Sequence, residues 1–171
     1  MMFNKKMKIM YIVPFYTNGW TEFDAMMPDI VSIDWQLRLL SYLSEKGHTV
    51  LVKQHPNSVV RMPEYFFESL GVKDVVGKFE DVYDQSDIIL TDYAGSTTFG
   101  AALKSNKPVI FIDFGFTTLR PSERKNLEQA CFLIEGKFLI DNRADINWDD
   151  LKLGLNRCHD HNDRSYVINN L

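Results

Sequence analysis

Apolar and polar residues follow two different patterns along this chain. Continuous apolar runs of strand length occur at residues 7–15, 48–54, 87–93 and 108–113, with a briefer one at 74–77. Between these runs, apolar residues recur at helical spacing in segments 34–46, 64–70, 79–85, 96–105 and from Pro121 onward. Residues 132–140 are predicted to be extended on either side of Gly136, and a last helix is predicted after Asn147.

Capping residues support several of these boundaries. Ser32 or Asp34 can cap the start of the first long helix, and Gly47 can end it. Pro121 stands where the first turn of a helix tolerates a proline. Each of these residues therefore agrees with the boundary that the apolar spacing predicts.

The alternation of strands and helices predicts an α/β fold with a mostly parallel sheet. We expect a Rossmann-like three-layer α/β/α arrangement with five to six strands, formed by a single domain over residues 1–171 whose C-terminal segment is helical from about residue 147. Ligands of such folds bind beyond the carboxyl ends of the strands. That rule selects the loops at 14–31, 54–63, 77–79, 92–98 and 113–121.

Composition narrows the class of protein. The chain has 171 residues, of which 45% are hydrophobic and 25% charged, as in a globular protein with a proper core. A net charge of −4 argues against a nucleic-acid partner, because such proteins carry basic surfaces that neutralise phosphates. No segment approaches the roughly 20 apolar residues that span a bilayer, and the N-terminus shows no cleavable secretion signal. We therefore expect a cytoplasmic protein.

The cysteines and the histidine-rich tail do not indicate a metal site. Cys131 and Cys158 both fall on apolar faces of predicted helices, which favours buried thiols over a disulfide or a metal pair. His159, Asp160 and His161 follow one another too closely to converge on one ion. We expect neither a metal nor a separate cofactor.

The segment at residues 91–103 carries the strongest chemical signal. A buried strand ends at Asp92, Gly95 permits a close backbone approach, and Ser96, Thr97 and Thr98 open a helix. The first-turn amides of a helix lack intrahelical partners and carry the positive end of its dipole. Together with the hydroxyls they form a candidate site for a phosphate or pyrophosphate. The alternative is that these residues only cap the helix.

A second segment follows the strand at residues 48–54. His55, held by Pro56 at the same edge of the sheet, could donate to a phosphate oxygen or act as an acid or base, and Lys53 could add charge. A histidine in such a place is also often structural or simply exposed. We select His55 as the candidate catalytic residue.

Carboxylates near the same edge could hold a ribose or a donor sugar. Asp92 and Asp113 end strands, and Glu123 lies on the following helix. Asp113 could equally cap its own loop, and Glu123 could belong to a solvated helix face. These three are the candidate nucleotide- or sugar-binding residues.

In order, the segments YIVPFY, VKQHP and SDIILTDYAGSTTFGAALKSNKPVIFID resemble the C-terminal half of the bacterial CDP-glycerol glycerophosphotransferase family, over about residues 8–155. The likeness extends to related surface-carbohydrate transferases of the GT-B fold. It implies a nucleotide-activated donor as substrate, with His55 at the donor phosphates and Ser96 and Thr97 holding the pyrophosphate. The loop after the first strand departs from the family, which often has a proline and an arginine there.

The resemblance also implies a partner. Family members have a further N-terminal domain that binds the acceptor, so we expect such a domain or subunit, a general base within it, and little turnover from this chain alone. The aromatic loop at 14–31, with Phe15, Tyr16, Trp20 and Phe23, could contact that partner or a membrane-bound acceptor at the inner face of the membrane; packing over the core is the alternative. Competing interpretations are a UDP-N-acetylglucosamine 2-epimerase-like half-domain and a non-catalytic nucleotide-sugar-binding or scaffold subunit.

Overall fold

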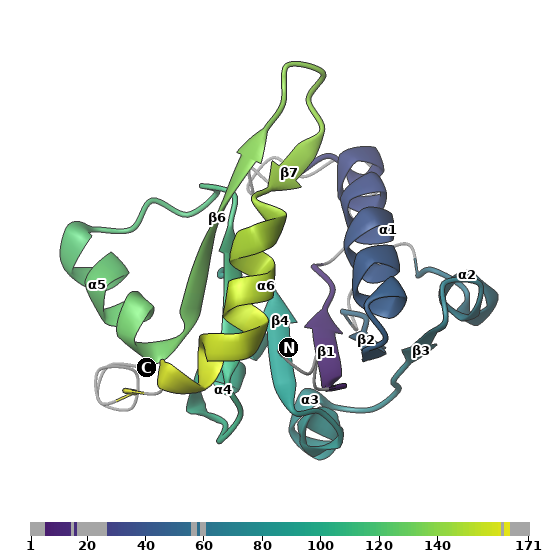
Figure 1. Cartoon of the computed structure of the whole chain (residues 1–171), viewed down its shortest axis with the longest axis horizontal. Helices are drawn as coiled ribbons and strands as arrows, with labels where there is room; N and C mark the ends of the chain where they lie inside the picture. Colours follow the sequence, from purple (N-terminus) through teal and green to yellow (C-terminus); the bar gives the residue numbers. More distant parts are fainter. Residues whose placement is uncertain are drawn as a thin grey trace, which may run out of the picture.

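The computed structural model describes residues 6–14, 16, 27–55, 58, 61–161 and 163–164. Its strands form one sheet in the order β3-β2-β1-β4-β5-β6-β7 (Figure 1). The strands are β1 (Lys8–Ile12), β2 (Thr49–Lys53), β3 (Val72–Asp74), β4 (Ile88–Thr91), β5 (Val109–Asp113), β6 (Phe132–Phe138) and β7 (Ala144–Ile146). The helices are α1 (Asp29–Glu45), α2 (Glu64–Glu68), α3 (Phe79–Val82), α4 (Thr97–Lys104), α5 (Pro121–Ala130) and α6 (Trp148–Arg157), with 3₁₀ turns η1 (Tyr83–Gln85) and η2 (Cys158–Asp160).

The sheet confirms the predicted Rossmann-like α/β class. Strands β1 to β6 pair in parallel, and β7 pairs antiparallel with β6. The strand order reverses between β1 and β4, which is the switch point where such sheets open a crevice. The sheet has seven strands rather than the expected five to six, because β7 is only three residues long and too short to produce an apolar period.

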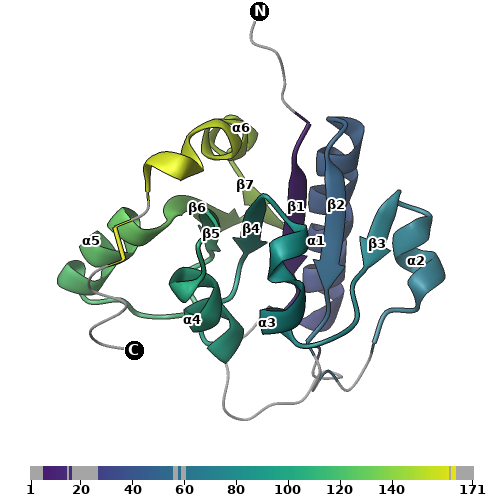
Figure 2. The same cartoon turned by 90° about the horizontal axis from the view of Figure 1, so that it is seen from below.

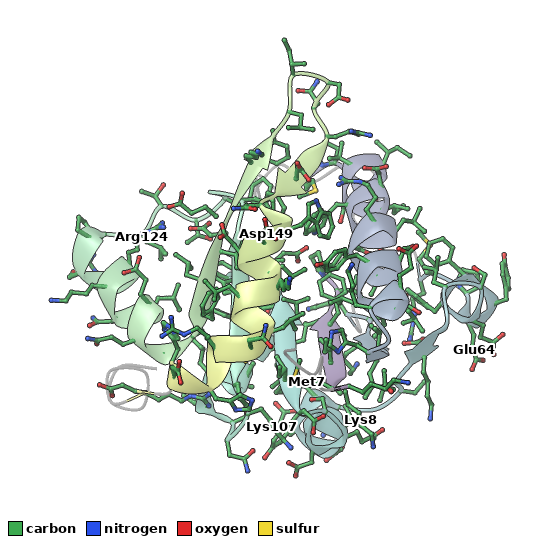
Figure 3. All side chains as sticks on the ribbon, in the orientation of Figure 1. Met7, Lys8, Glu64, Lys107, Arg124 and Asp149 are labelled. Atoms are coloured by element: carbon green, nitrogen blue, oxygen red, sulfur yellow. The ribbon has the colours of Figure 1, made fainter. Side chains whose placement is uncertain are left out.

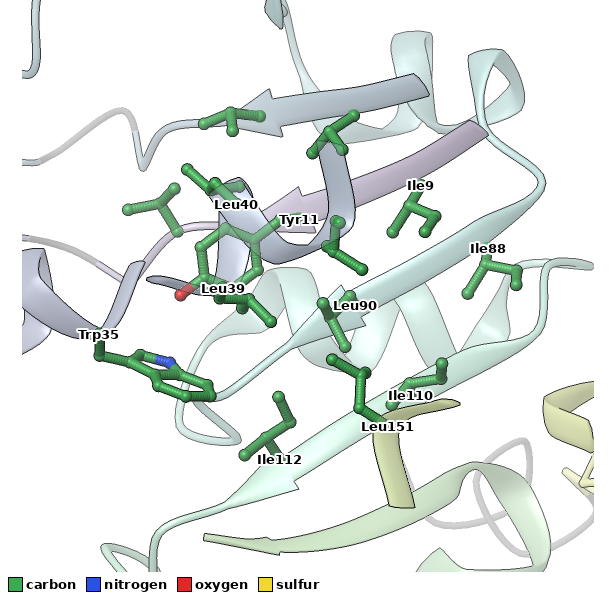
Figure 4. Close-up of a cluster of buried hydrophobic side chains, with 14 of the residues drawn as sticks. Ile9, Tyr11, Trp35, Leu39, Leu40, Ile88, Leu90, Ile110, Ile112 and Leu151 are labelled. Carbon is green, nitrogen blue, oxygen red and sulfur yellow. The ribbon is translucent and has the colours of Figure 1, made fainter. Parts of the chain in front are cut away.

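Helices cover the sheet on both faces, and each face has its own apolar core (Figure 2). On one face α1, α2 and α6 contribute to the core, which includes Trp35, Leu39, Leu40, Phe67, Leu151 and Leu155. On the other face α3, α4 and α5 contribute Phe79, Val82, Phe99, Leu103, Leu127 and Ala130. In Figure 4, Tyr11 and Trp35 lie at one end of the first core and Ile88 at the other. The three-layer prediction is therefore confirmed.

The first long helix starts earlier than its sequence suggests. It begins at Asp29 after Pro28, so the predicted cap at Ser32 or Asp34 is wrong. Ser32 is instead buried inside α1, where its hydroxyl accepts a hydrogen bond from the Gln36 side chain at 2.9 Å. The predicted end is confirmed: Gly47 has a φ of 81° and donates to the Ser44 carbonyl at 2.8 Å, a conformation that glycine adopts without steric cost.

Polar pairs tie the helix layers to the sheet at both ends. At the amino-terminal edge, Lys107 lies 3.4 Å from the Asp84 carboxylate, and Figure 3 shows it beside α3, in the same region as Lys8. On α5, Arg124 lies 3.5 Å from the Asp113 carboxylate and 2.7 Å from that of Glu135. Each of these pairs has at least one partner that is a third or more exposed, and such pairs are each worth about 0–1 kcal/mol, so the two apolar cores dominate the stability.

Both cysteines are buried and free, as predicted. Burial raises the pKa of Cys131 and raises that of Cys158 to about 11, so both thiols are protonated near neutral pH. Among the described residues, no group of three histidine, cysteine or acidic side chains is placed to hold a metal ion. No described helix is both long enough and apolar enough to cross a membrane.

Candidate functional site

Two cavities flank the first turn of α4, one on each side of it. We call the first, of about 490 Å³, the cationic cavity. It is lined by Ile12, Lys53, Gln54, His55, Arg61, Val76, Gly77, Lys78, Phe79, Glu80, Thr97 and Thr98. The cavity thus brings together the ends of β1, β2 and β3 with the start of α4. The structure places His55 on the same cavity as Thr97 and Thr98, as the sequence predicted.

The cationic cavity gathers positive charge from separate loops. Lys53, Arg61 and Lys78 line it, and Glu80 is the one carboxylate among the lining residues. Lys53 is only 8% exposed, and its ammonium group donates to the Gln54 carbonyl at 3.0 Å. Burial first, and then the nearby Arg61 cation, lower the pKa of Lys53. An anion entering the cavity would restore the interactions that the buried ammonium group loses by leaving water.

His55 is half-buried beside this lysine. Burial lowers the pKa of its imidazole below the ordinary value of 6.5, and the Lys53 charge lowers it further. The ring is therefore largely neutral at neutral pH. A phosphate bound in the cavity would favour its protonation, because a nearby negative charge stabilises the imidazolium form.

Gln54 fixes one wall of the cavity. Its side-chain amide donates to the Asp74 carboxylate at 2.8 Å and to the Met62 carbonyl at 3.0 Å, and its carbonyl oxygen accepts from the Met62 amide at 2.9 Å. The Arg61 guanidinium group lies 3.7 Å from the same Asp74 carboxylate. One buried amide thus connects the end of β2, the end of β3 and the segment that carries Arg61.

The start of α4 combines a cap with open donors. The Ser96 hydroxyl accepts a hydrogen bond from the Phe99 amide at 3.1 Å, so Ser96 acts as the N-cap. Helix capping, the alternative to anion binding, is therefore the role of the Ser96 side chain. The amides of Thr97 and Thr98 have no partner within the helix, as in any first turn, and both residues line the cationic cavity. The backbone amides of these two residues are therefore the donors that an anion in the cavity could use.

The Tyr93 side chain lies against Gly95. A Cβ at this position would lie 2.6 Å from Cζ of Tyr93, so the tyrosine ring would have to move to accommodate it. On this side of the glycine the neighbouring group is therefore Tyr93. Gly95 and Ser96 instead contribute to the second cavity.

The second cavity, of about 730 Å³, runs between α4 and α5, and we call it the α4–α5 groove. It is lined by Ala94, Gly95, Ser96, Thr97, Phe99, Gly100, Ala101, Leu103, Lys104, Thr117, Leu119, Glu123 and Leu127. Thr97 lines both cavities, so they meet at the first turn of α4. Both volumes are in the range of about 300–1,000 Å³ that is usual for small-molecule sites.

Asp92 lies away from both cavities, contrary to its expected role with the nucleotide or sugar. Its Oδ2 atom accepts hydrogen bonds from the Tyr11 hydroxyl at 2.6 Å and from Nε1 of Trp35 at 2.9 Å. Its Oδ1 atom is buried without a hydrogen-bond partner among the described residues. Burial raises the pKa of this carboxyl to about 6, although the hydrogen bonds from Tyr11 and Trp35 oppose the shift. Asp92 is thus part of the core beneath α1.

Asp113 and Glu123 are engaged in local interactions. Asp113 accepts from the Gly115 amide at 2.8 Å and lies 3.5 Å from the Arg124 guanidinium group, so it caps its loop as the alternative interpretation proposed. Glu123 accepts from the Arg120 amide at 2.9 Å, which completes a capping box at the start of α5. The hydrogen bonds from Arg120 lower the pKa of Glu123. Of the two, Glu123 lines the α4–α5 groove, whereas Asp113 lines neither of the two cavities described above.

Two cations of the site were not selected from the sequence. Arg61 and Lys78 lie within the edge loops 54–63 and 77–79, so a search of those loops for basic residues would have found them. Pro56 lies outside the described residues, as does most of the aromatic loop, including Phe15, Trp20 and Phe23. Tyr16, which is described, is buried and donates from its hydroxyl to Gln36, as expected if this residue packs over the core.

Comparison with known proteins identifies no family. No family model matches the sequence, and no curated protein matches it. An imine reductase from Myxococcus stipitatus in complex with NADP+ has a TM-score of 0.40 at 13% identity, over 77% of this chain and 41% of that one. Its V8 variant in complex with NAD+ has a TM-score of 0.42 at 12% identity, with 79% and 41% covered. An imine reductase from Pseudomonas sp. has a TM-score of 0.38 at 13% identity, with 79% and 42% covered. The chain spans about two-fifths of each of these proteins, and the likeness concerns the fold alone.

Proposed function

We propose that this chain binds the phosphate groups of a nucleotide-activated donor in the cationic cavity. In this proposal it is the donor-binding half of a cytoplasmic glycosyl- or glycerophosphotransferase that contributes to a cell-surface polymer. The acceptor and the general base come from a partner domain or subunit, and the reaction takes place at the inner face of the membrane. The resemblance of residues 8–155 to surface-polymer transferases supports the choice of reaction class.

The observation that supports the proposal best is the convergence of donors in one cavity. Lys53 reaches it from the end of β2, and His55 and Arg61 from the segment that follows. Lys78 reaches it from the loop before α3, and the first turn of α4 also faces it. Phosphate oxygens accept hydrogen bonds from ammonium, guanidinium and backbone N–H groups, and a helix start adds a favourable dipole. A nucleoside diphosphate or monophosphate offers the matching acceptors.

The reaction needs these groups mainly to stabilise the nucleoside phosphate that leaves. An acceptor hydroxyl attacks the transferred group, the bond from that group to the nucleoside phosphate breaks, and the electron pair stays on the phosphate oxygen. The amides of Thr97 and Thr98 stabilise this developing charge together with the Lys53 ammonium group, and the His55 imidazole donates a hydrogen bond. The proton of the acceptor hydroxyl passes to the base of the partner.

Calorimetric titration of the full chain with CDP, UDP, CMP and GDP tests the proposal. Lys53→Met removes the buried cation at little change in side-chain length, and we expect an affinity lower by about tenfold or more because a charge-assisted hydrogen bond is lost. Lys152→Met on the exposed surface of α6 is the matched control and leaves the affinity unchanged. If the wild-type chain binds none of the four, or if Lys53→Met binds as the wild type does, the proposal fails.

The pH dependence of binding isolates His55. Burial and the Lys53 charge lower the pKa of His55 in the free protein, and a bound anion raises it again because it favours the protonated ring. The affinity should therefore rise as the pH falls from 8 toward 6. In His55→Gln the same titration series should lose most of that rise. A series that is equally steep in both proteins would show that His55 is not in contact with the bound anion.

A further inference from the structure

The α4–α5 groove contains a glycine that no internal contact explains. Gly100 lies within α4, where glycine is less favourable than alanine by about 0.5–1 kcal/mol. A Cβ built on it would meet nothing within 4 Å, whereas one on Gly136 or Gly154 would meet an aromatic ring. Gly100 lines the groove. Its missing side chain therefore widens the groove rather than allowing two parts of the protein to pack.

The groove adjoins the proposed phosphate site. Ser96 and Thr97 line it at the start of α4, and Thr97 also lines the cationic cavity. A molecule that holds phosphates at the first turn of α4 can extend from there along α4 over Gly100. From this adjacency we infer that the α4–α5 groove holds the base and ribose of the donor nucleotide, with the phosphates passing Thr97 into the cationic cavity. This inference rests on the proposed function.

The lining of the groove selects a nucleoside over a sugar or polyol. Its walls are apolar along most of their length, with Phe99, Leu103, Leu119 and Leu127 on opposite sides. A planar base gains from burial against such walls, whereas a sugar or polyol would leave hydroxyl groups without partners. The polar rim at Thr117 and Glu123 offers hydrogen-bond partners for the hydroxyl groups of a ribose.

The transferred group then lies on the other side of Thr97, in the cationic cavity. The cationic cavity has polar and charged groups on most of its walls, including Gln54, Arg61 and Lys78. Such a lining suits a group rich in hydroxyls or one that is itself anionic, such as a polyol phosphate or an acidic sugar. The donor therefore lies across the start of α4, with its base over Gly100.

Substitution of Gly100 tests this arrangement. Gly100→Leu places a side chain in the groove, and no described atom outside the backbone of α4 itself lies within 4 Å of the new Cβ. Titrations of the full chain with a nucleoside diphosphate and with inorganic pyrophosphate then separate the two halves of the site. We expect Gly100→Leu to weaken the nucleoside diphosphate by about tenfold or more and to leave pyrophosphate within about twofold. Lys152→Leu on α6 adds the same side chain away from the groove and changes neither affinity.

Leu119→Ala provides a second variant that does not depend on filling space. It removes one wall of the groove from the loop after β5, so the nucleoside diphosphate weakens by about threefold to tenfold while pyrophosphate binds as before. If both variants bind the nucleoside diphosphate like the wild type, another chain segment or molecule occupies the groove, and the inference is overturned. In that case, binding of pyrophosphate by the wild-type chain still supports the phosphate site. If the wild-type chain binds neither ligand, the proposed function fails together with the inference.

Discussion

The buried Asp92 carboxyl makes the stability of this protein depend on pH in an unusual direction. Most carboxylates stabilise the folded state when ionised, whereas burial raises the pKa of Asp92 from 3.8 to about 6. The folded chain therefore holds this proton more tightly than the unfolded chain. Well below pH 4 both states are protonated and no stability is lost. As the pH rises from about 4 to 6, the unfolded chain releases this proton while the folded chain keeps it, so the stability falls; above 6 both states are ionised and the loss is complete.

The size of the effect follows from the two pKa values. The shift of about 2 units corresponds to about 3 kcal/mol once Asp92 is fully ionised in both states. Between pH 4.5 and 7.5 the change amounts to about 2 kcal/mol, because part of the loss has already occurred at the lower pH. Asp92→Asn cannot ionise, so its stability relative to the wild type should increase by this amount over the same interval.

Urea unfolding of both proteins at pH 4.5 and 7.5 provides the assay, with the free energy of unfolding obtained by linear extrapolation. The comparison cancels the titration of groups that the two proteins share. As a control, Asp84→Asn removes an exposed carboxylate that lies 3.4 Å from Lys107, and the difference from wild type stays below about 1 kcal/mol at both pH values. A constant difference for Asp92→Asn would refute the view that burial dominates this site. A difference of opposite sign would mean that the hydrogen bonds from Tyr11 and Trp35 prevail.

Three further substitutions test the local geometry by thermal or urea unfolding. Ser96→Ala should lower the free energy of unfolding by about 1 kcal/mol, because the hydrogen bond from the Phe99 amide to the capping hydroxyl is lost; Ser96→Asn should restore most of it. Gly100→Ala should raise the stability by about 0.5–1 kcal/mol, since the new methyl group meets no atom and improves the helix; a loss would show that the site is more crowded than described. Gly136→Ala should lower the stability by about 1–3 kcal/mol, because its Cβ would lie 2.8 Å from Cγ of Phe114; an unchanged midpoint would contradict that packing.

Much of the fold could be predicted because the parallel strands are continuous apolar runs. The sequence places β1, β2, β4 and β5 within two or three residues of their observed ends, and the helices between them follow from their apolar spacing. The start of α1 was not predicted correctly, because no polar side chain caps the helix after Pro28. The edge strand β7 escaped because it is three residues long and takes its conformation from its pairing with β6.

The candidate site could be predicted only in part, and strand alternation explains the division. Asp92 follows Leu90 by two residues and therefore faces the same side of the sheet, toward α1 and away from the cavities. Lys53 follows Leu51 in the same way, on the side of α3 and α4 where the cationic cavity lies. Applied to both strands, this rule would have selected Lys53, and not Asp92, as a residue that faces the cationic cavity. The position of the Tyr93 side chain against Gly95 is a tertiary contact that no sequence pattern reveals.

The bonds of Gln54 bear on the thermodynamics of ligand capture. Because its amide holds the Met62 backbone and the Asp74 carboxylate in place, the neighbouring Arg61 occupies its position before any anion arrives. Ordering a long side chain on binding costs about 0.5–1.5 kcal/mol. At this wall much of that entropy loss belongs to the folding step, so an anion that binds as proposed would meet a surface that is already organised.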